Sequence, residues 1–188
     1  MKKIILLIVV CISLIQITYA QDTTSIYKKF RVDLMLGGAF SVKGYNQYTE
    51  AYGGIFSVEP RYNLNDKFSI GLRYVFSEVF NNPDNHQDVR TDSHSFLANA
   101  TYTAGISRTV RLYTGAGVGV SSSTEKVPVF ILNSKTVATK TEVAFMPRAG
   151  VQIWRFTTDI FYNYTGDNNT NFAGMAFGFY FGGGKRNK

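Results

Sequence analysis

The stretch FSIGLRYVF alternates between two kinds of side chain. Its even positions, from Phe68 to Phe76, are large and apolar or aromatic, whereas most of its odd positions are small or polar. A period of two indicates a β-strand whose two faces meet different environments. Arg73 stands on the face with the smaller side chains, so the first question is which environment receives its guanidinium group.

Seven further segments alternate in the same way, which predicts eight strands in total. Most of them approach the about 9–11 residues that a tilted strand needs to cross a bilayer. The predicted strands are residues 30–40, 54–64, 68–76, 94–103, 110–120, 142–153, 156–164 and 175–181. No stretch after residue 20 resembles a membrane helix, so the chain would have to enter a membrane as a closed barrel.

The connections between these segments alternate in length. Short turns are predicted at residues 65–67, 104–109 and 154–155, and longer polar loops at residues 41–53, 77–93, 121–141 and 165–171. This alternation is typical of a meander with one end at the cell exterior and the other in the periplasm. The predicted fold class is therefore all-β: an eight-stranded antiparallel up-and-down transmembrane β-barrel over residues 30–181.

The charged face of the strands distinguishes a membrane barrel from a soluble, lipocalin-like one. This face carries arginine but no lysine in the strand cores, and it is rich in glycine. An eight-stranded barrel has room inside only for packed side chains, so long arginines need small neighbours there. Aromatic residues gather near strand ends, as in the girdles of membrane barrels. They are Phe30, Phe40, Tyr52, Tyr62, Phe68, Phe76, Tyr102, Trp154, Phe156, Tyr164 and Phe172.

We therefore predict that the charged strand residues fill the lumen as ion pairs. An unpaired charge there would cost several kcal/mol, and five arginines face four carboxylates, which is close to balance. The predicted lumen network consists of Arg31, Asp33, Glu59, Arg61, Arg73, Arg111, Glu142, Arg148 and Asp159. An open channel is the alternative interpretation of the same residues.

Residues 1–20 have the layout of a secretory signal peptide, with Lys2 and Lys3 before an apolar run and Ala20 at the expected cleavage site. The only cysteine, Cys11, lies in this leader, so we expect no disulfide and no cysteine catalysis in the mature chain. Removing the two lysines lowers the formal net charge from +7 to +5. The remaining cations are scattered, which argues against nucleic-acid binding.

Four stretches carry a resemblance to a known family: VEPRYNLNDKFSIGLRYVF (58–76), RLYTGAGVGV (111–120), MPRAGVQIW (146–154) and MAFGFYFGGGKRNK (175–188). They resemble the small outer-membrane β-barrels of Gram-negative bacteria, the OmpA/OmpX-like porin family. The resemblance implies outer-membrane localisation, contact with outer-membrane lipid, insertion by the barrel assembly machinery and a monomer. Residues 21–29 and 182–188 would then be short periplasmic segments, and the tail after Phe181 departs from members that end on phenylalanine.

Candidate catalytic residues are confined to RTDSHS (90–95) and the nearby His86. Some eight-stranded outer-membrane barrels modify lipid A with serine and histidine near the outer rim. Here alternation points Ser95 into the lumen and His94 outward, so the two would not form a catalytic pair. We predict no enzyme activity, and the sequence offers no metal-binding spacing and no cofactor motif.

The stretch KVPVFILNSKTVATKTEV (126–143) predicts a hairpin that continues two strands beyond the membrane and turns near Asn133-Ser134. Exposed hairpin edges can add a strand from a partner, so loop 121–141 is a candidate site for an extracellular protein. Its apolar positions are Val127, Val129, Phe130, Ile131 and Leu132. A loop without a binding role is the alternative.

The leading functional hypothesis is an integral outer-membrane protein with a structural or surface-interaction role and a largely closed lumen. A narrow diffusion pore is the alternative, and a lipid A-modifying enzyme is the third hypothesis.

Overall fold

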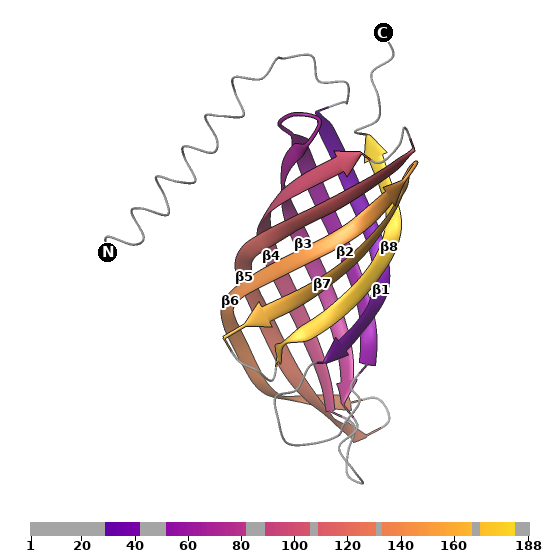
Figure 1. The fold of residues 1–188 in the computed structure, drawn as a ribbon. Helices are drawn as coiled ribbons and strands as arrows, with labels where there is room; N and C mark the ends of the chain where they lie inside the picture. Colours follow the sequence, from indigo (N-terminus) through magenta and orange to yellow (C-terminus); the bar gives the residue numbers. More distant parts are fainter. Residues whose placement is uncertain are drawn as a thin grey trace, which may run out of the picture.

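The computed structural model describes residues 29–41, 52–81, 89–105, 109–130, 133–166 and 170–182. Within these ranges every strand pairs antiparallel with its sequence neighbours, and β8 pairs with β1 to close a barrel (Figure 1). The strands are β1 (Phe30–Ser41), β2 (Tyr52–Asn63), β3 (Phe68–Asn81), β4 (Val89–Gly105), β5 (Val110–Phe130), β6 (Asn133–Ile153), β7 (Phe156–Thr165) and β8 (Phe172–Gly182). The predicted fold class is confirmed.

The described ranges contain no helix that is long and apolar enough to cross a membrane. The predicted leader, residues 1–20, lies outside the described residues, as do most of the two predicted periplasmic segments 21–29 and 182–188.

Five strands are longer by several residues than their hydrophobic alternation predicted. β3 continues to Asn81, β4 begins at Val89, β5 extends to Phe130, β6 begins at Asn133 and β8 begins at Phe172. Loop 77–93 was therefore predicted too long, because residues 77–81 and 89–93 are strand, whereas the hairpin predicted at residues 126–143 is present in the backbone pairing of loop 121–141. Polar residues occupy both faces of the described parts of the β4, β5 and β6 extensions, so the alternation of apolar side chains stops there while the backbone ladder continues.

The start of β1 and the end of β8 lie at the same rim of the barrel as the short turns, which is the upper rim in Figure 1. Arg31 near the start of β1 is paired with Gly182 at the end of β8. In the first turn the Asn65 Oδ1 atom accepts hydrogen bonds from the backbone nitrogens of Lys67 and Phe68, at 2.8 and 2.7 Å. This is an Asx turn, in which the side chain fixes the reversal of the backbone.

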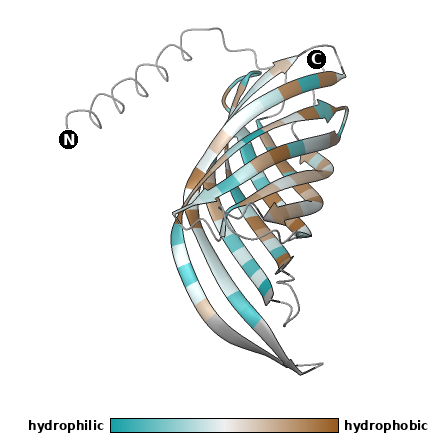
Figure 2. Cartoon of the chain, turned by 60° about the horizontal axis from the view of Figure 1, so that its bottom comes forward, coloured by the Kyte–Doolittle hydropathy of each residue, from teal (hydrophilic) through white to brown (hydrophobic). Residues whose placement is uncertain are grey.

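Side chains alternate between an apolar exterior and a mostly polar interior. Leu72 and Phe177 are 67% and 64% exposed on the outer face, whereas Arg73 and Asp159 are at most 1% exposed. The alternating brown and teal bands of the strands in Figure 2 follow this pattern. An apolar outer wall is the surface that a membrane barrel presents to lipid.

Phe172 is a correction to the predicted aromatic girdle. It is 3% exposed and lies inside the barrel, where its ring meets that of Phe161 at 79° with centroids 6.1 Å apart. In β8 the even-numbered Ala176 faces inward and the odd-numbered Phe177 faces outward, so parity places Phe172 on the inner side.

Candidate functional site: the ionic layer inside the barrel

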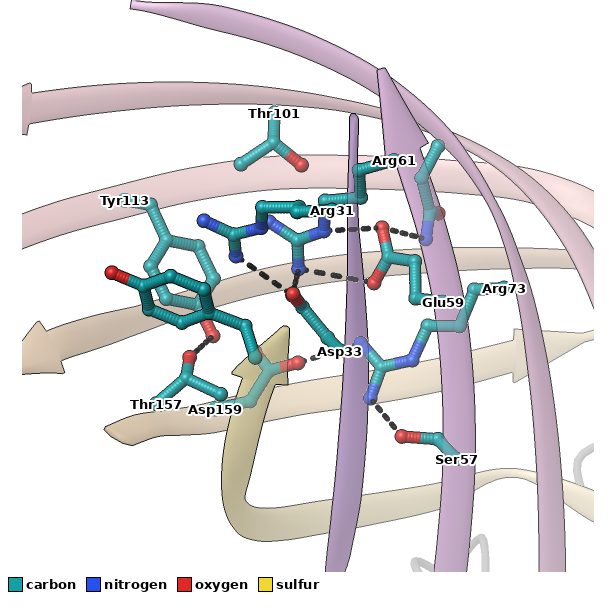
Figure 3. Close-up of polar contacts among 12 residues, drawn as sticks. Arg31, Asp33, Ser57, Glu59, Arg61, Arg73, Thr101, Tyr113, Thr157 and Asp159 are labelled. Atoms are coloured by element: carbon teal, nitrogen blue, oxygen red, sulfur yellow. Dashed lines mark hydrogen bonds and ion pairs between the residues drawn. The ribbon is translucent and has the colours of Figure 1, made fainter. Parts of the chain in front are cut away.

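Seven charged side chains from five strands meet at one level of the lumen, near the short-turn rim. Each of them is at most 5% exposed. They come from β1 (Arg31, Asp33), β2 (Glu59, Arg61), β3 (Arg73), β6 (Arg148) and β7 (Asp159). We call this set the ionic layer, and Figure 3 shows most of it.

The first half of the ionic layer is built around Asp33. Its Oδ2 atom accepts from Nη2 of Arg31 at 2.7 Å and from Nη2 of Arg61 at 2.8 Å. Arg31 and Arg61 are direct cross-strand neighbours, a placement that would repel without a shared anion. Arg61 also reaches Glu59 through its Nε atom, at 2.9 Å from Oε1.

The second half links distant parts of the chain. Arg148 binds Glu59 with both terminal nitrogens, at 2.5 and 2.8 Å, which is the bidentate geometry that favours arginine over lysine. Arg73 donates from Nη1 to Asp159 Oδ2 at 2.6 Å across 86 residues of sequence. Arg73 therefore points into the lumen, where its guanidinium group is paired.

Two aromatic rings lie against arginines of the ionic layer. Four arginines face three carboxylates, which leaves one excess positive charge. The Arg73 guanidinium lies 4.7 Å from the ring centroid of Phe161, and that of Arg31 lies 4.6 Å from that of Tyr180. The negative faces of these rings stabilise cations in a desolvated site.

Two residues of the predicted network lie at its periphery. Arg111 is half-buried and donates to the backbone carbonyl of Asp66 at 2.7 Å, in the short turn before β3. Glu142 is half-buried on the other side and pairs with Lys140 at 2.9 Å. Strand parity alone placed both residues on the inner face, but it does not give the level at which each one lies.

An apolar layer adjoins the ionic layer on the side of the long connections. It was not predicted, although alternation already placed Met35, Ile55 and Val75 on the charged face. The buried cluster consists of Met35, Ala39, Ile55, Val75, Val79, Leu97, Ala144, Met146, Phe161, Phe172 and Ala176. One level of the lumen is therefore filled by ion pairs and the next mainly by apolar side chains, with the buried Ser57, Ser77 and Asn163 among them.

A second ionic cluster lies on the outer wall, beyond the apolar band, and the sequence analysis missed it. Arg90 bridges Glu78 at 3.0 Å and Asp92 at 2.8 Å, and Lys126 binds Asp92 at 2.7 Å. Burial raises the pKa of the Asp92 carboxyl, but the hydrogen bonds from Arg90 and Lys126 outweigh burial, so the pKa is lowered. We call Glu78, Arg90, Asp92 and Lys126 the outer cluster.

The candidate catalytic residues are separated by the barrel wall. Ser95 is buried inside and hydrogen-bonds to Ser121 at 2.8 Å. His94 is exposed on the outer face, where its Nδ1 atom lies 2.8 Å from the Tyr74 hydroxyl. His86 lies outside the described residues, and the described ranges contain no group of three side chains suited to a metal ion.

The predicted hairpin forms a two-stranded ribbon by its backbone pairing. Val127 pairs with Lys135 and Phe130 with Asn133, so the chain reverses just before the predicted Asn133-Ser134 turn. Ile131 and Leu132 lie outside the described residues, and the surroundings of the Val127, Val129 and Phe130 side chains are not described.

Comparisons with known proteins agree with this architecture. A family model described as "Outer membrane protein beta-barrel domain" matches residues 5–184. The Neisserial surface protein A structure matches with a TM-score of 0.57 and 19% identity over 80% of this chain and 95% of that one. The Yersinia pestis attachment invasion locus protein Ail, in complex with the heparin analogue sucrose octasulfate, matches with a TM-score of 0.51 and 16% identity over 81% and 99%. No curated protein sequence matches the chain.

Proposed function

Because the chain belongs to the outer membrane protein β-barrel family, we propose that it is a non-catalytic surface-interaction protein of the outer membrane. In this proposal its lumen is closed, and it binds an extracellular protein through the β5–β6 ribbon. Specific binding in barrels of this kind would be expected on the connections that a rigid wall holds in place.

The ionic layer and the adjoining apolar layer together support a closed lumen. An ion crossing the barrel would have to displace Arg73 from Asp159 and Arg148 from Glu59, and then pass the apolar layer. Breaking buried pairs is strongly unfavourable, and apolar constrictions resist both water and ions.

The length of β5 and β6 is the observation that carries the surface role. The last pair of the β6–β7 ladder joins Ala144 to Thr165, whereas β6 continues outward to Asn133 beside β5. The described β6 side chains of this extension, residues 138–143, are largely exposed, including Thr139, Thr141 and Val143. Figure 2 shows the ribbon reaching past the rest of the barrel, with mainly teal and pale bands. A strand that leaves its sheet in this way offers backbone groups to an incoming extended segment.

The ribbon proposal is tested with a phage-displayed peptide library selected on the full chain in lipid nanodiscs. We expect enriched peptides that no longer bind after deletion of residues 127–138, while the deleted protein still folds. Thr141→Pro should also abolish binding, because proline removes a backbone donor from the β6 ladder. Thr124→Val, on the paired strand β5, is the matched control and should retain binding.

Peptides that bind the deleted protein equally well, or no enrichment over empty nanodiscs, would contradict the role of the ribbon. Folding is checked by heat-modifiable migration on a gel for every variant.

A narrow diffusion pore is the second candidate function. Gln152, on the short-turn side of the ionic layer, and Asn163, on the side of the long connections, are at most 1% exposed, and their side-chain polar atoms have no hydrogen-bond partner among the described residues. Buried polar groups of this kind usually bind water, which favours hydration of the lumen on the short-turn side of the ionic layer and beside Phe172 in the apolar layer. A pore requires these two regions to connect.

A further inference from the structure

The excess positive charge of the ionic layer belongs to five of its residues. Arg73 and Asp159 lie 2.6 Å apart, so their charges balance each other. Three arginines and two carboxylates remain, namely Arg31, Arg61, Arg148, Asp33 and Glu59. Arg148 lies 3.6 Å from Asp159, against 2.5 Å from Glu59, so it belongs with the second group. An arginine side chain keeps its proton at physiological pH, so this group cannot lose its excess charge by deprotonation.

Arg61 is the arginine of this group that contacts both carboxylates. Its Nη2 atom lies 2.8 Å from Asp33 and its Nε atom 2.9 Å from Glu59, as Figure 3 shows. The third guanidinium nitrogen, Nη1, is buried and has no hydrogen-bond partner among the described residues. Because Nε and Nη2 form the edge of the planar group that faces Glu59, Nη1 lies on an edge that is turned away from it. A buried N–H group of a cation is thus left for another acceptor.

Arg31 adds to the positive charge beside this nitrogen. It is paired with Arg61 across β1 and β2, and its Nη2 atom binds the same Asp33 oxygen at 2.7 Å. The next inward-facing pair on these two strands, Asp33 and Glu59, lies one level farther from the short turns. Arg31 and Arg61 therefore form the edge of the ionic layer that faces the short-turn rim.

The lumen between this edge and the short-turn rim is lined by polar groups that can donate hydrogen bonds. The inward-facing side chains described there include the hydroxyl groups of Ser69, Thr103 and Thr157. Gln152 is 1% exposed, and its amide has no hydrogen-bond partner among the described residues. Arg111, which is half-buried, adds a positive charge. The described strand residues between the ionic layer and this rim place no carboxylate in the lumen, so the path favours an anion.

Tyr113 does not supply the missing negative charge. Its ring centroid lies 5.5 Å from the Arg61 guanidinium carbon, which makes its hydroxyl the nearby group that could ionise. That hydroxyl instead donates its proton to the backbone carbonyl oxygen of Thr158 at 3.0 Å, as a neutral phenol does.

We propose that the ionic layer binds one small monovalent anion, of the class of chloride, at Nη1 of Arg61. One negative charge balances the three arginines and two carboxylates, whereas a divalent anion would reverse the imbalance. The interior of an eight-stranded barrel has little room beyond its own side chains, which favours a halide over a bulky organic anion. The anion enters from the short-turn side and stops at the apolar layer. The site is therefore compatible with a closed lumen and independent of the surface ribbon.

Urea unfolding of the full chain in detergent micelles tests the site, with sodium gluconate replaced stepwise by sodium chloride at constant ionic strength. An anion that binds only the folded protein stabilises it by mass action, so the urea midpoint should rise with chloride. Arg31→Met leaves two arginines for two carboxylates, so this variant should lose the chloride dependence. Lys67→Met removes an exposed positive charge at the short-turn rim and should retain it.

Bromide gives a second measurement on the unchanged protein, which decides the question if Arg31→Met does not fold. Crystals grown in sodium bromide should show an anomalous difference peak in contact with Nη1 of Arg61. A urea midpoint that does not respond to chloride would overturn the proposal. A chloride dependence that survives Arg31→Met, or that Lys67→Met removes equally, would also overturn it. So would crystals in which bromide lies only beside exposed cations or gives no peak.

Discussion

The ionic layer and the outer cluster use the same chemistry in opposite surroundings. In the ionic layer every charged side chain is at most 5% exposed, and three of the four arginines hold a carboxylate from another strand. In the outer cluster the side chains of Arg90 and Lys126 are 42% and 31% exposed. Similar distances therefore correspond to very different energies, because water screens the second set and not the first.

The difference indicates what each cluster does. Removing one partner from a buried network leaves a charge that water cannot reach, so the ionic layer holds the barrel interior in one arrangement. In the outer cluster only the cations are largely in water, whereas the Asp92 side chain is 8% exposed, so the loss of a cation should cost less there than in the ionic layer. Stability should thus depend on the inner layer, while the outer surface is open to variation.

The largest loss of stability is expected from substitutions in the Glu59–Arg148 pair. Glu59→Gln alone should lower the free energy of unfolding by about 3–5 kcal/mol, because it leaves the buried Arg148 without its bidentate carboxylate. Arg148→Met should cost less, because Glu59 keeps its contact with Arg61 and the layer then holds three arginines and three carboxylates. The double variant should lose less than the sum of the two. Urea unfolding in detergent micelles measures this, with Glu78→Gln in the outer cluster as the control. Additive losses would contradict a coupled ionic layer.

Packing against the ionic layer should give an intermediate effect. A Cβ atom added at Gly117 would lie 1.9 Å from Asn99 Oδ1, and Asn99 donates to Glu59. Gly117→Ala should therefore cost about 1–3 kcal/mol as Asn99 is displaced. Gly54→Ala is the matched control, since a Cβ there meets nothing within 4 Å. Equal stability of the two variants would show that the lumen is loosely packed.

The outer cluster should give a small effect that depends on pH. Arg90→Ala is expected to lower the free energy of unfolding by at most about 1 kcal/mol at neutral pH. Because the folded-state pKa of Asp92 is lowered, its contribution is present above the ordinary carboxyl pKa of about 4 and disappears as the pH falls through the lowered value.

Urea titrations at neutral and acidic pH measure this contribution. Asp92→Asn should be less stable than the unchanged protein at neutral pH, and the difference should disappear in acid. A stability difference that grows in acid would contradict a lowered pKa of Asp92 in the folded protein.

The smallest expected effect is on lipid A. His94 and Ser95 lie on opposite faces of the wall, so His94→Ala should leave the lipid A of producing cells unchanged. Mass spectrometry of extracted lipid A, from cells with and without the protein, checks this. A mass difference that depends on His94 would restore the enzyme hypothesis.

Strand parity allowed the barrel and its two faces to be predicted from the sequence. The face of Arg73 follows from a period of two, but its partner Asp159 depends on the register of several strands. Arg111 and Glu142 show the same limit, because they share the inner face and lie at other levels. The lengths of β5 and β6 were underestimated because residues such as Ser122, Thr124 and Thr139 show no alternation of apolar side chains that would indicate a strand.

The closed lumen is the central claim, and planar-bilayer conductance of the purified protein tests it most directly. A lumen filled by the ionic and apolar layers predicts no stable single-channel steps at moderate voltage. Steady steps from the unchanged protein, altered in size by Arg73→Ala, would contradict it.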